Sequence, residues 1–437
     1  MRKLALSLGL VSALAISGAV MAQDDLSGVD PSGQSVLYWH QFSGAQGDTI
    51  AALIEEFNST NEWGITVEGT RPGSYNDIRE QFNGAITSGE LPALVAAYAN
   101  DAASYASDGA VVDINTYVND ATYGLSEEEL ANFNTALFDF DTVDGELLVF
   151  PHQLSAQFFL YNESLLERMG LEVPTSVEAF KEVACTVAEA TGPNGEDMQG
   201  YPLTTDASAF ESWVAAHGGT IWDGEAFTFA GNEAVLSALA LYKELYDNGC
   251  GYIPAEAFAE QSDFALGLNP FIVSSSAGYT FVIAAFEDAG SSDVWVPTVF
   301  PYAAETPSLQ VFLPGIALVA GTPEQELASW LFLKFLVQES SAVTWSGGTG
   351  YFNPVTSTVD LLTEETVTFP GLFPYFNASN TWLNSEGVRL YSSPSVAAYG
   401  TVRGLLSEAL ANVTSNGLSV EETVEILQEG ADAALDG

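Results

Sequence analysis

The sequence predicts an α/β protein with two interleaved lobes, each built on its own sheet and covered by helices. Short β-rich runs alternate with amphipathic helical patterns along most of the chain. About 415 residues follow the N-terminal apolar run, which is too long a chain for one hydrophobic core. The sequence has no linker-like or low-complexity tract, so the lobes are expected to be interleaved rather than joined end to end.

The expected elements begin with alternating strands and helices. The apolar run 36–39 is typical of a buried strand, and apolar residues in 50–57 recur with helical spacing. The same analysis gives a strand at 65–67, a helix at 78–86 and a strand at 94–98. This order predicts a mostly parallel sheet with helices on both faces. Ligands of such sheets bind at the carboxyl ends of the strands.

Later helices have clear start signals. Three segments fit the capping box, in which a Ser or Thr and a Glu three residues later satisfy the first backbone N–H groups: Ser126–Glu129, Thr175–Glu178 and Ser419–Glu422. Apolar periodicity predicts one further strand and four helices, at 316–320 and at 177–187, 235–246, 327–335 and 420–431.

Residues 1–22 have the organisation of a signal peptide. Arg2 and Lys3 precede an apolar run to Met21, and Ala22 ends an A-x-A-like cleavage site. The alternative is an uncleaved membrane anchor, because the run approaches the ~18 residues that span a bilayer. The cleavage site favours removal, and the lack of a following Cys argues against a lipid anchor. The mature protein is therefore expected to begin at Gln23 and to be periplasmic or extracellular.

The charge balance excludes some partners. The chain has 10 Lys and Arg against 58 Asp and Glu, a formal net charge of −48. Such a surface repels nucleic acid and anionic lipid. The acidity either adapts the protein to a saline exterior, where ions screen the repulsion, or is ordinary acidic drift of a secreted protein.

Two cysteines, Cys185 and Cys250, are expected to form a disulfide in an oxidising compartment. The alternative is two separately buried thiols. Two cysteines and three histidines offer no convincing metal cluster, so neither a metal nor a cofactor is expected.

A series of short motifs spans the chain in a fixed order. They are Val36–His40, Glu56–Asn58, Gly73–Tyr75, Gly89–Val95, Asp144–Pro151, Leu160–Glu163, Thr228–Phe229, Asn248–Cys250 and Gly350–Pro354. In this order they resemble the extracellular solute-binding proteins of carbohydrate ABC importers. The similarity is greatest to the sn-glycerol-3-phosphate and glycerophosphodiester binders, which are related to the maltose-binding group.

The resemblance implies a periplasmic binding protein-like fold of type II, with a ligand cleft at a hinge that the chain crosses three times. The crossings are expected near Pro151, Phe312 and Gly348. The first lobe would then comprise residues 35–150 plus 313–347. The second would comprise 151–312 plus 348–437.

The resemblance also implies the ligand contacts, which are Tyr75, Ser155, Ser276, Gly315, Tyr351 and Arg389. Trp39 and Trp345 are further candidates, because aromatic faces stack on the C–H face of a sugar. The guanidinium of Arg389 can fork onto hydroxyl, phosphate or carboxylate oxygens. The structural alternatives are core packing for the aromatic residues and an interlobe ion pair for Arg389.

Two departures from the glycerol-phosphate binders favour a sugar or a sugar-like polyol. The tryptophan pair of those binders is expected to be replaced here by Tyr201 and Thr204. The position at which those binders carry an acidic residue falls in the segment Tyr98–Asn100 of this chain, which has none. The resulting hypothesis is a monomeric substrate-binding component that delivers its ligand to the transmembrane subunits of an ABC importer. Glycerol 3-phosphate or glycerophosphodiester binding is the alternative within the same scaffold.

Two other classes of protein remain open, a secreted carbohydrate-active enzyme and an adhesion or scaffold module. Catalysis is not expected, because His40 and His152 have no evident catalytic constellation beside them. The Ser274–Ser276 run also lacks the G-x-S-x-G pattern of a nucleophile elbow.

Overall fold

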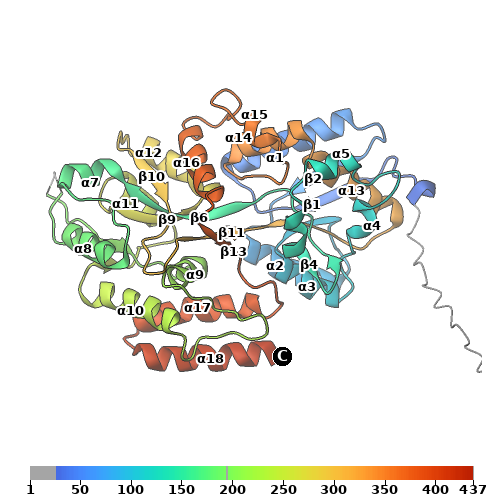
Figure 1. The fold of residues 1–437 in the computed structure, drawn as a ribbon. Helices are drawn as coiled ribbons and strands as arrows, with labels where there is room; N and C mark the ends of the chain where they lie inside the picture. Colours follow the sequence, from blue (N-terminus) through green and yellow to red (C-terminus); the bar gives the residue numbers. More distant parts are fainter. Residues whose placement is uncertain (1–25, 193–194, 437) are drawn as a thin grey trace, which may run out of the picture.

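The computed structural model describes residues 26–192 and 195–436, and the predicted signal peptide lies outside this part. Two lobes lie side by side and are joined through the strands at the centre of Figure 1. Each lobe has its own sheet with helices packed against it, which confirms the predicted two-lobed α/β class. No helix in the described residues is long and apolar enough to cross a bilayer.

The first-lobe sheet has the order β12-β3-β1-β2. Its strands are β1 (Ser35–Trp39), β2 (Thr66–Thr70), β3 (Leu94–Ala97) and β12 (Gly315–Leu318). The predicted β-α-β-α-β unit is confirmed, because β1 pairs in parallel with both β2 and β3. The late strand β12 joins β3 in the antiparallel sense.

The first-lobe helices follow the predicted apolar stripes. Ile50, Leu53, Ile54 and Phe57 are all buried on one face of α1. The residues bordering this sheet form the helices α1 (Gly44–Thr60), α2 (Tyr75–Ser88), α3 (Ala99–Ser107), α4 (Asn115–Val118), α5 (Glu127–Ala131), α6 (Phe138–Asp141), α13 (Pro323–Leu336), α14 (Glu339–Thr349) and α15 (Thr358–Leu361), and a hairpin of β4 (Thr142–Val143) and β5 (Glu146–Leu147).

The second-lobe sheet is centred on β6. Strand β6 (Ser155–Asn162) pairs antiparallel with β9 (Phe271–Ser275), β10 (Trp295–Thr298) and β11 (Ser308–Phe312). Strand β13 (Arg389–Tyr391) adds in parallel to β11. The parallel order of the first five elements therefore does not extend to this sheet.

The helices of the second lobe cover both faces of this sheet (Figure 1). They are α7 (Glu163–Met169), α8 (Val177–Ala188), α9 (Ala207–Ala216), α10 (Glu233–Asp247), α11 (Ala259–Ala265), α12 (Tyr279–Asp288), α16 (Phe373–Leu383), α17 (Tyr399–Val413) and α18 (Val420–Asp436), with a small pair β7 (Tyr201–Pro202) and β8 (Gly251–Tyr252).

Two of the three predicted capping boxes form as expected. Ser126 and Glu129 exchange hydrogen bonds at α5, and Ser419 and Glu422 do so before α18. The third does not form: the N-cap of α8 is Ser176 rather than Thr175, its hydroxyl accepts the backbone N–H of Ala179, and alanine at that position has no side-chain acceptor to return the bond.

The chain passes between the sheets at closely spaced points. Phe150 bridges Ile316 in the first lobe, and β6 begins at Ser155 in the second. The return runs from the end of β11 to Gly315. Beyond α14, Val355 bridges Phe133, so the residues around position 355 pack on the first lobe although the sequence-based boundary assigns them to the second.

The predicted disulfide is confirmed. Cys185 on α8 is bonded to Cys250, just before β8, with the two Cα atoms 4.4 Å apart. The bridge closes a loop of 65 residues that includes α9 and α10.

Candidate functional site

Aromatic side chains meet where the first lobe faces the second. The Tyr75 ring, at the start of α2, lies 4.9 Å from the ring of Tyr98, which follows β3. The Trp345 and Tyr351 rings are stacked 5.7 Å apart, and Phe42 contacts Trp345 edge-on at 4.7 Å. These rings form a largely apolar wall at the carboxyl ends of β1 and β3, where ligands of parallel sheets bind.

This wall carries buried polar atoms that have no hydrogen-bond partner within the described protein. They are Tyr38 Oη, His40 Nδ1, both side-chain amide atoms of Gln41, Tyr75 Oη, both ring nitrogens of His152, Gln153 Oε1, Ser276 Oγ and Trp345 Nε1. Buried polar groups in native proteins are nearly always paired, and each orphan costs about 1–3 kcal/mol. So many in one place indicate a region whose partners come from a solute or from water. We call these eight residues the orphan cluster.

The orphan cluster is electrically neutral. Burial lowers the pKa of His152 to about 3 and that of His40 to about 4, so both rings are uncharged at neutral pH. Burial also raises the pKa of Tyr351 to about 12, and the Tyr351 hydroxyl lies beside Tyr75 and Gln41. None of these contacts completes the hydrogen-bonding capacity of Tyr75 or Gln41.

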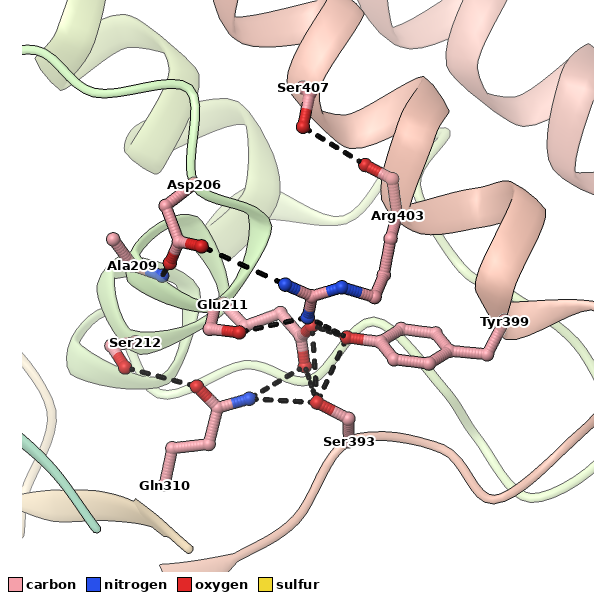
Figure 2. A network of polar contacts seen from close by, with 10 residues as sticks. Asp206, Ala209, Glu211, Ser212, Gln310, Ser393, Tyr399, Arg403 and Ser407 are labelled. Carbon is pink, nitrogen blue, oxygen red and sulfur yellow. Dashed lines mark hydrogen bonds and ion pairs between the residues drawn. The ribbon is translucent and has the colours of Figure 1, made fainter. Parts of the chain in front are cut away.

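A polar network from the second lobe lies opposite. Figure 2 shows Glu211 of α9 surrounded by donors from three other segments. Its carboxylate accepts hydrogen bonds from Gln310 at 3.2 Å, from Ser393 at 3.2 Å and from Tyr399. The Arg403 guanidinium donates to Ser208 at 2.8 Å and to Tyr399 at 3.2 Å. We call Glu211, Gln310, Ser393, Tyr399 and Arg403 the Glu211 network.

Burial dominates the electrostatics of this network. It raises the pKa of Glu211 to about 7, against the opposing effects of Tyr399, Arg403 and Ser393. Asp206 forms an ion pair with Arg403 at 3.7 Å. The positive charge of Arg403 is therefore already balanced by carboxylates from α9 and its N-cap.

The two lobes touch beside this network. A Cβ added to Gly400, at the start of α17, would lie 3.2 Å from Arg79 Nη1 and 3.9 Å from Asn100 Nδ2 in the first lobe. The Ser395 hydroxyl donates to the backbone oxygen of Phe140 at 3.3 Å. Arg403 also lowers the otherwise raised pKa of Tyr98, so the network and the aromatic wall face each other across the lobe boundary.

The structure brings several predicted site residues together. Tyr75, Tyr351 and Trp345 lie in the aromatic wall, and Ser276 belongs to the orphan cluster beside the backbone of Gly350. Gly315 starts β12, where a Cβ would come within 2.5 Å of the Phe150 carbonyl oxygen. Only glycine fits that approach, which gives Gly315 a packing role.

The other predicted residues have different surroundings. Ser155 is buried at the start of β6, opposite Phe312. Trp39 packs edge-on against Phe82 of α2. Arg389 is exposed on β13, with Nη2 3.5 Å from the Gly219 carbonyl oxygen and the guanidinium over the Tyr391 ring.

The structure places Tyr201, one of the two residues expected where the glycerol-phosphate binders carry tryptophan, away from solvent. It is buried in the core of the second lobe between Phe159 and Phe180, and its hydroxyl accepts the indole N–H of Trp213 at 3.2 Å.

Sequence reasoning missed Gln41, Glu211 and Arg403. Gln41 follows the end of β1, the position at which polar side chains reach a ligand site, and this was an available signal. For Glu211 the available signal was a single Glu within the otherwise largely apolar sequence of α9. In the structure every residue of that helix is buried. Arg403 had no comparable signal, because a single Arg on a C-terminal helix is ordinarily a surface residue.

Comparison with known proteins decides the family. The family model described as bacterial extracellular solute-binding protein matches residues 52–373. The chain belongs to this family. As a solute-binding protein of an extracellular family, it acts in the periplasm or outside the cell, and the orphan cluster lies where the two lobes of such a protein meet.

Curated relatives of this solute-binding protein include sn-glycerol-3-phosphate-binding periplasmic proteins UgpB. That of Agrobacterium fabrum is 22% identical over 196 residues, 44% of this chain and 42% of its own. That of Brucella abortus is 22% identical over 213 residues, 48% of this chain and 45% of its own. The chain thus spans less than half the length of these relatives.

Solved structures share the fold over nearly the whole chain. UgpB from Mycobacterium tuberculosis, in complex with glycerophosphocholine, has a TM-score of 0.76 at 19% identity and covers 93% of this chain and 99% of its own. The GacH receptor of Streptomyces glaucescens, solved unliganded and with acarbose, has a TM-score of 0.76 at 20% identity and covers 92% and 98%.

Glu211 predicts a specific pH dependence of stability. Its folded pKa of about 7 lies above its ordinary value of 4.5, so its stabilising contribution is complete below pH 4.5 and is lost as pH rises through 7. Relative to Glu211→Gln, the wild-type free energy of unfolding should fall by about 3 kcal/mol between pH 4 and 8, at about 1.4 kcal/mol per pKa unit. Urea unfolding of both proteins across this range measures the difference. Parallel stability curves would contradict the shifted carboxyl.

Proposed function

We propose that this solute-binding protein is the substrate-binding component of an ABC importer and that it captures a sugar or a sugar-like polyol. Its partners would be that ligand and the transmembrane subunits of the importer, to which it delivers the ligand. The observation that carries the proposal is the orphan cluster, with unpaired polar atoms set among stacked aromatic rings between two lobes. Closed clefts with a few converging polar groups are typical of small-molecule sites.

The chemistry of these atoms favours a neutral, hydroxylated ligand. The Oε1 atoms of Gln41 and Gln153 accept hydrogen bonds only, and each neutral histidine ring has one accepting nitrogen. A sugar hydroxyl both donates and accepts, so it can satisfy these acceptors together with donors such as Trp345 Nε1. The phosphate group of a phosphorylated ligand only accepts, so it cannot itself pair with the amide oxygens.

The guanidinium groups at the lobe boundary support the same choice. Arg79 is paired with Asp101 at 3.7 Å, and Arg403 is paired with Asp206 at 3.7 Å. A phosphate group at either of these two arginines would have to compete with a carboxylate, whereas Arg71 donates to the Gln41 backbone oxygen at 3.1 Å beside the orphan cluster. Glycerophosphodiester binding remains the second candidate, because the curated relatives are glycerol-phosphate binders.

We propose that the protein is not an enzyme. The buried Glu211 carboxylate is held by donors from Gln310, Ser393 and Tyr399. This arrangement fixes the side chain and satisfies its oxygens, as expected of a binding or structural group.

A thermal-unfolding panel tests the proposed function. The compounds are glucose, maltose, ribitol, glycerol 3-phosphate and glycerophosphocholine, each at millimolar concentration. A specific ligand at 100 times its Kd stabilises the folded protein by about 2.7 kcal/mol. We expect stabilisation by at least one neutral compound and by neither phosphate. Stabilisation by the phosphate compounds alone would refute the neutral ligand, and no response to any compound would contradict sugar and polyol capture.

The proposed mechanism also predicts a change of shape. We propose lobes of residues 35–150 plus 313–347 and 151–312 plus 348–437, with the residues around position 355 packed on the first, that close about the hinge when a ligand pairs with groups from both. A ligand that contacts both lobes shifts the population toward the closed form. The radius of gyration from small-angle scattering should therefore decrease at saturating ligand, while the mass stays that of a monomer. An unchanged radius with proven binding would contradict lobe closure.

A further inference from the structure

A cavity of about 250 Å³ extends from the Glu211 network into the second lobe. It lies between the later part of α9 and the segment 391–395 that follows β13. Glu211 and Ser393 belong both to its lining and to the network in Figure 2. The cavity is thus continuous with the polar wall that faces the first lobe.

The lining of this cavity suits hydroxyl groups. Six of the eleven lining residues carry a side-chain hydroxyl or a carboxyl group, and none of the eleven is basic. They are Glu211, Thr220, Tyr391, Ser392, Ser393 and Ser395. Serine and threonine hydroxyls both donate and accept, as sugar hydroxyls do. The Arg389 guanidinium lies beside two lining residues, over the Tyr391 ring and 3.5 Å from the Gly219 carbonyl oxygen, where it can donate to a sugar hydroxyl.

Aromatic surface is present in the same cavity. Trp222 lines it, and the Trp222 ring is packed 4.8 Å from Phe227 on the side of the protein core. Tyr391 also lines it, with its hydroxyl 3.4 Å from Ser212. Both rings are held in place by the protein, and aromatic faces are the surfaces on which sugar rings stack.

The hydrogen-bonding groups are arranged before any ligand arrives. Gln310, Ser393 and Tyr399 fix the Glu211 carboxyl, so binding orders few additional side chains. Burial raises the pKa of Glu211 to about 7, which lets the group accept or donate near neutral pH. The volume is below the ~300–1,000 Å³ of pockets for drug-sized ligands, which matches one small ring.

We propose that this cavity is an extension of the solute site that takes an additional uncharged, hydroxylated ring, so that the preferred ligand is a disaccharide or a longer oligosaccharide. The proposal rests on the proposed function, since the first ring would occupy the orphan cluster. It adds a second region of recognition within the second lobe, bounded by Trp222 and Tyr391.

Calorimetry with glucose, maltose and maltotriose tests the extension. Ser392→Trp fills the cavity from its lining, and Ser292→Trp places the same side chain at an exposed position between α12 and β10. In the wild type and in Ser292→Trp, maltose or maltotriose should bind at least tenfold tighter than glucose. In Ser392→Trp this advantage should disappear, with the unfolding temperature little changed.

The outcomes separate this inference from the proposed function. Equal affinities for the three sugars, or an advantage that persists in Ser392→Trp, overturn the extension and leave sugar capture intact. No binding of the three sugars, with another neutral ligand found by thermal unfolding, overturns the extension alone. A crystal structure with maltotriose that shows a ring between Trp222 and Tyr391 supports it, and one with the cavity empty of sugar refutes it.

Discussion

The double variant Gln41→Leu/Tyr75→Phe is expected to bind its sugar roughly thirtyfold to several-thousandfold more weakly than the wild type, which corresponds to about 2–5 kcal/mol. At the same time, the ligand-free variant should unfold at a higher temperature. Both amide atoms of Gln41 and the Tyr75 hydroxyl are buried without partners, so they cost folding energy when no ligand pairs with them. Removing them relieves that cost and deprives the ligand of its partners.

Calorimetry for affinity and calorimetric unfolding for stability measure the two effects. Gln81→Leu/Tyr161→Phe is the matched control, since Gln81 is exposed on α2 and Tyr161 lies half-buried on β6. It should leave affinity unchanged. If affinity is unchanged in the test variant, or stability and affinity both fall, the orphan cluster is part of the folded framework rather than of the ligand site.

Removal of the disulfide by Cys185→Ala/Cys250→Ala is expected to lower the free energy of unfolding by about 4 kcal/mol, because a 65-residue loop is no longer closed in the unfolded chain. The loop contains α9, and therefore Glu211. The folded variant should still bind sugar, since neither sulfur lies in the orphan cluster or in the Glu211 network.

Urea unfolding of the variant, compared with the oxidised and the reduced wild type, tests this prediction. The reduced wild type serves as the control and should match the variant. A variant as stable as the oxidised protein would show that the bridge constrains the unfolded chain little.

Elements with strong periodicity could be predicted from the sequence. The stripe on α1 and the strands β1 and β3 follow from patterns in which one face, or the whole strand, is buried. Strand β13 could not be predicted this way, because Arg389 and Leu390 are exposed and the strand forms by pairing with β11. Its formation depends on a partner that precedes it by some eighty residues.

The candidate site likewise contains residues that could be predicted from the sequence and residues that could not. Tyr75, Tyr351 and Trp345 were inferred from the family resemblance together with the stacking preferences of aromatic residues, and the structure brings them together. The Glu211 network joins residues from α9, β11, the segment after β13 and α17, so its existence depends on the packing of four distant segments. No local pattern carries that information.

Strand β12 has a consequence for the order in which the protein can fold. Strand β12 completes the first sheet by pairing with β3, and its Ile316 bridges Phe150. During synthesis, β12 emerges long after β3 and Phe150. A nascent chain that ends before Gly315 has β3 with an unpaired edge, the kind of surface to which other chains attach. The first lobe, which begins the sequence, therefore cannot complete its sheet until β12 has been synthesised. Its sheet is completed only when most of the polypeptide is available, so truncated products should be recognised as unfinished by proteases and chaperones.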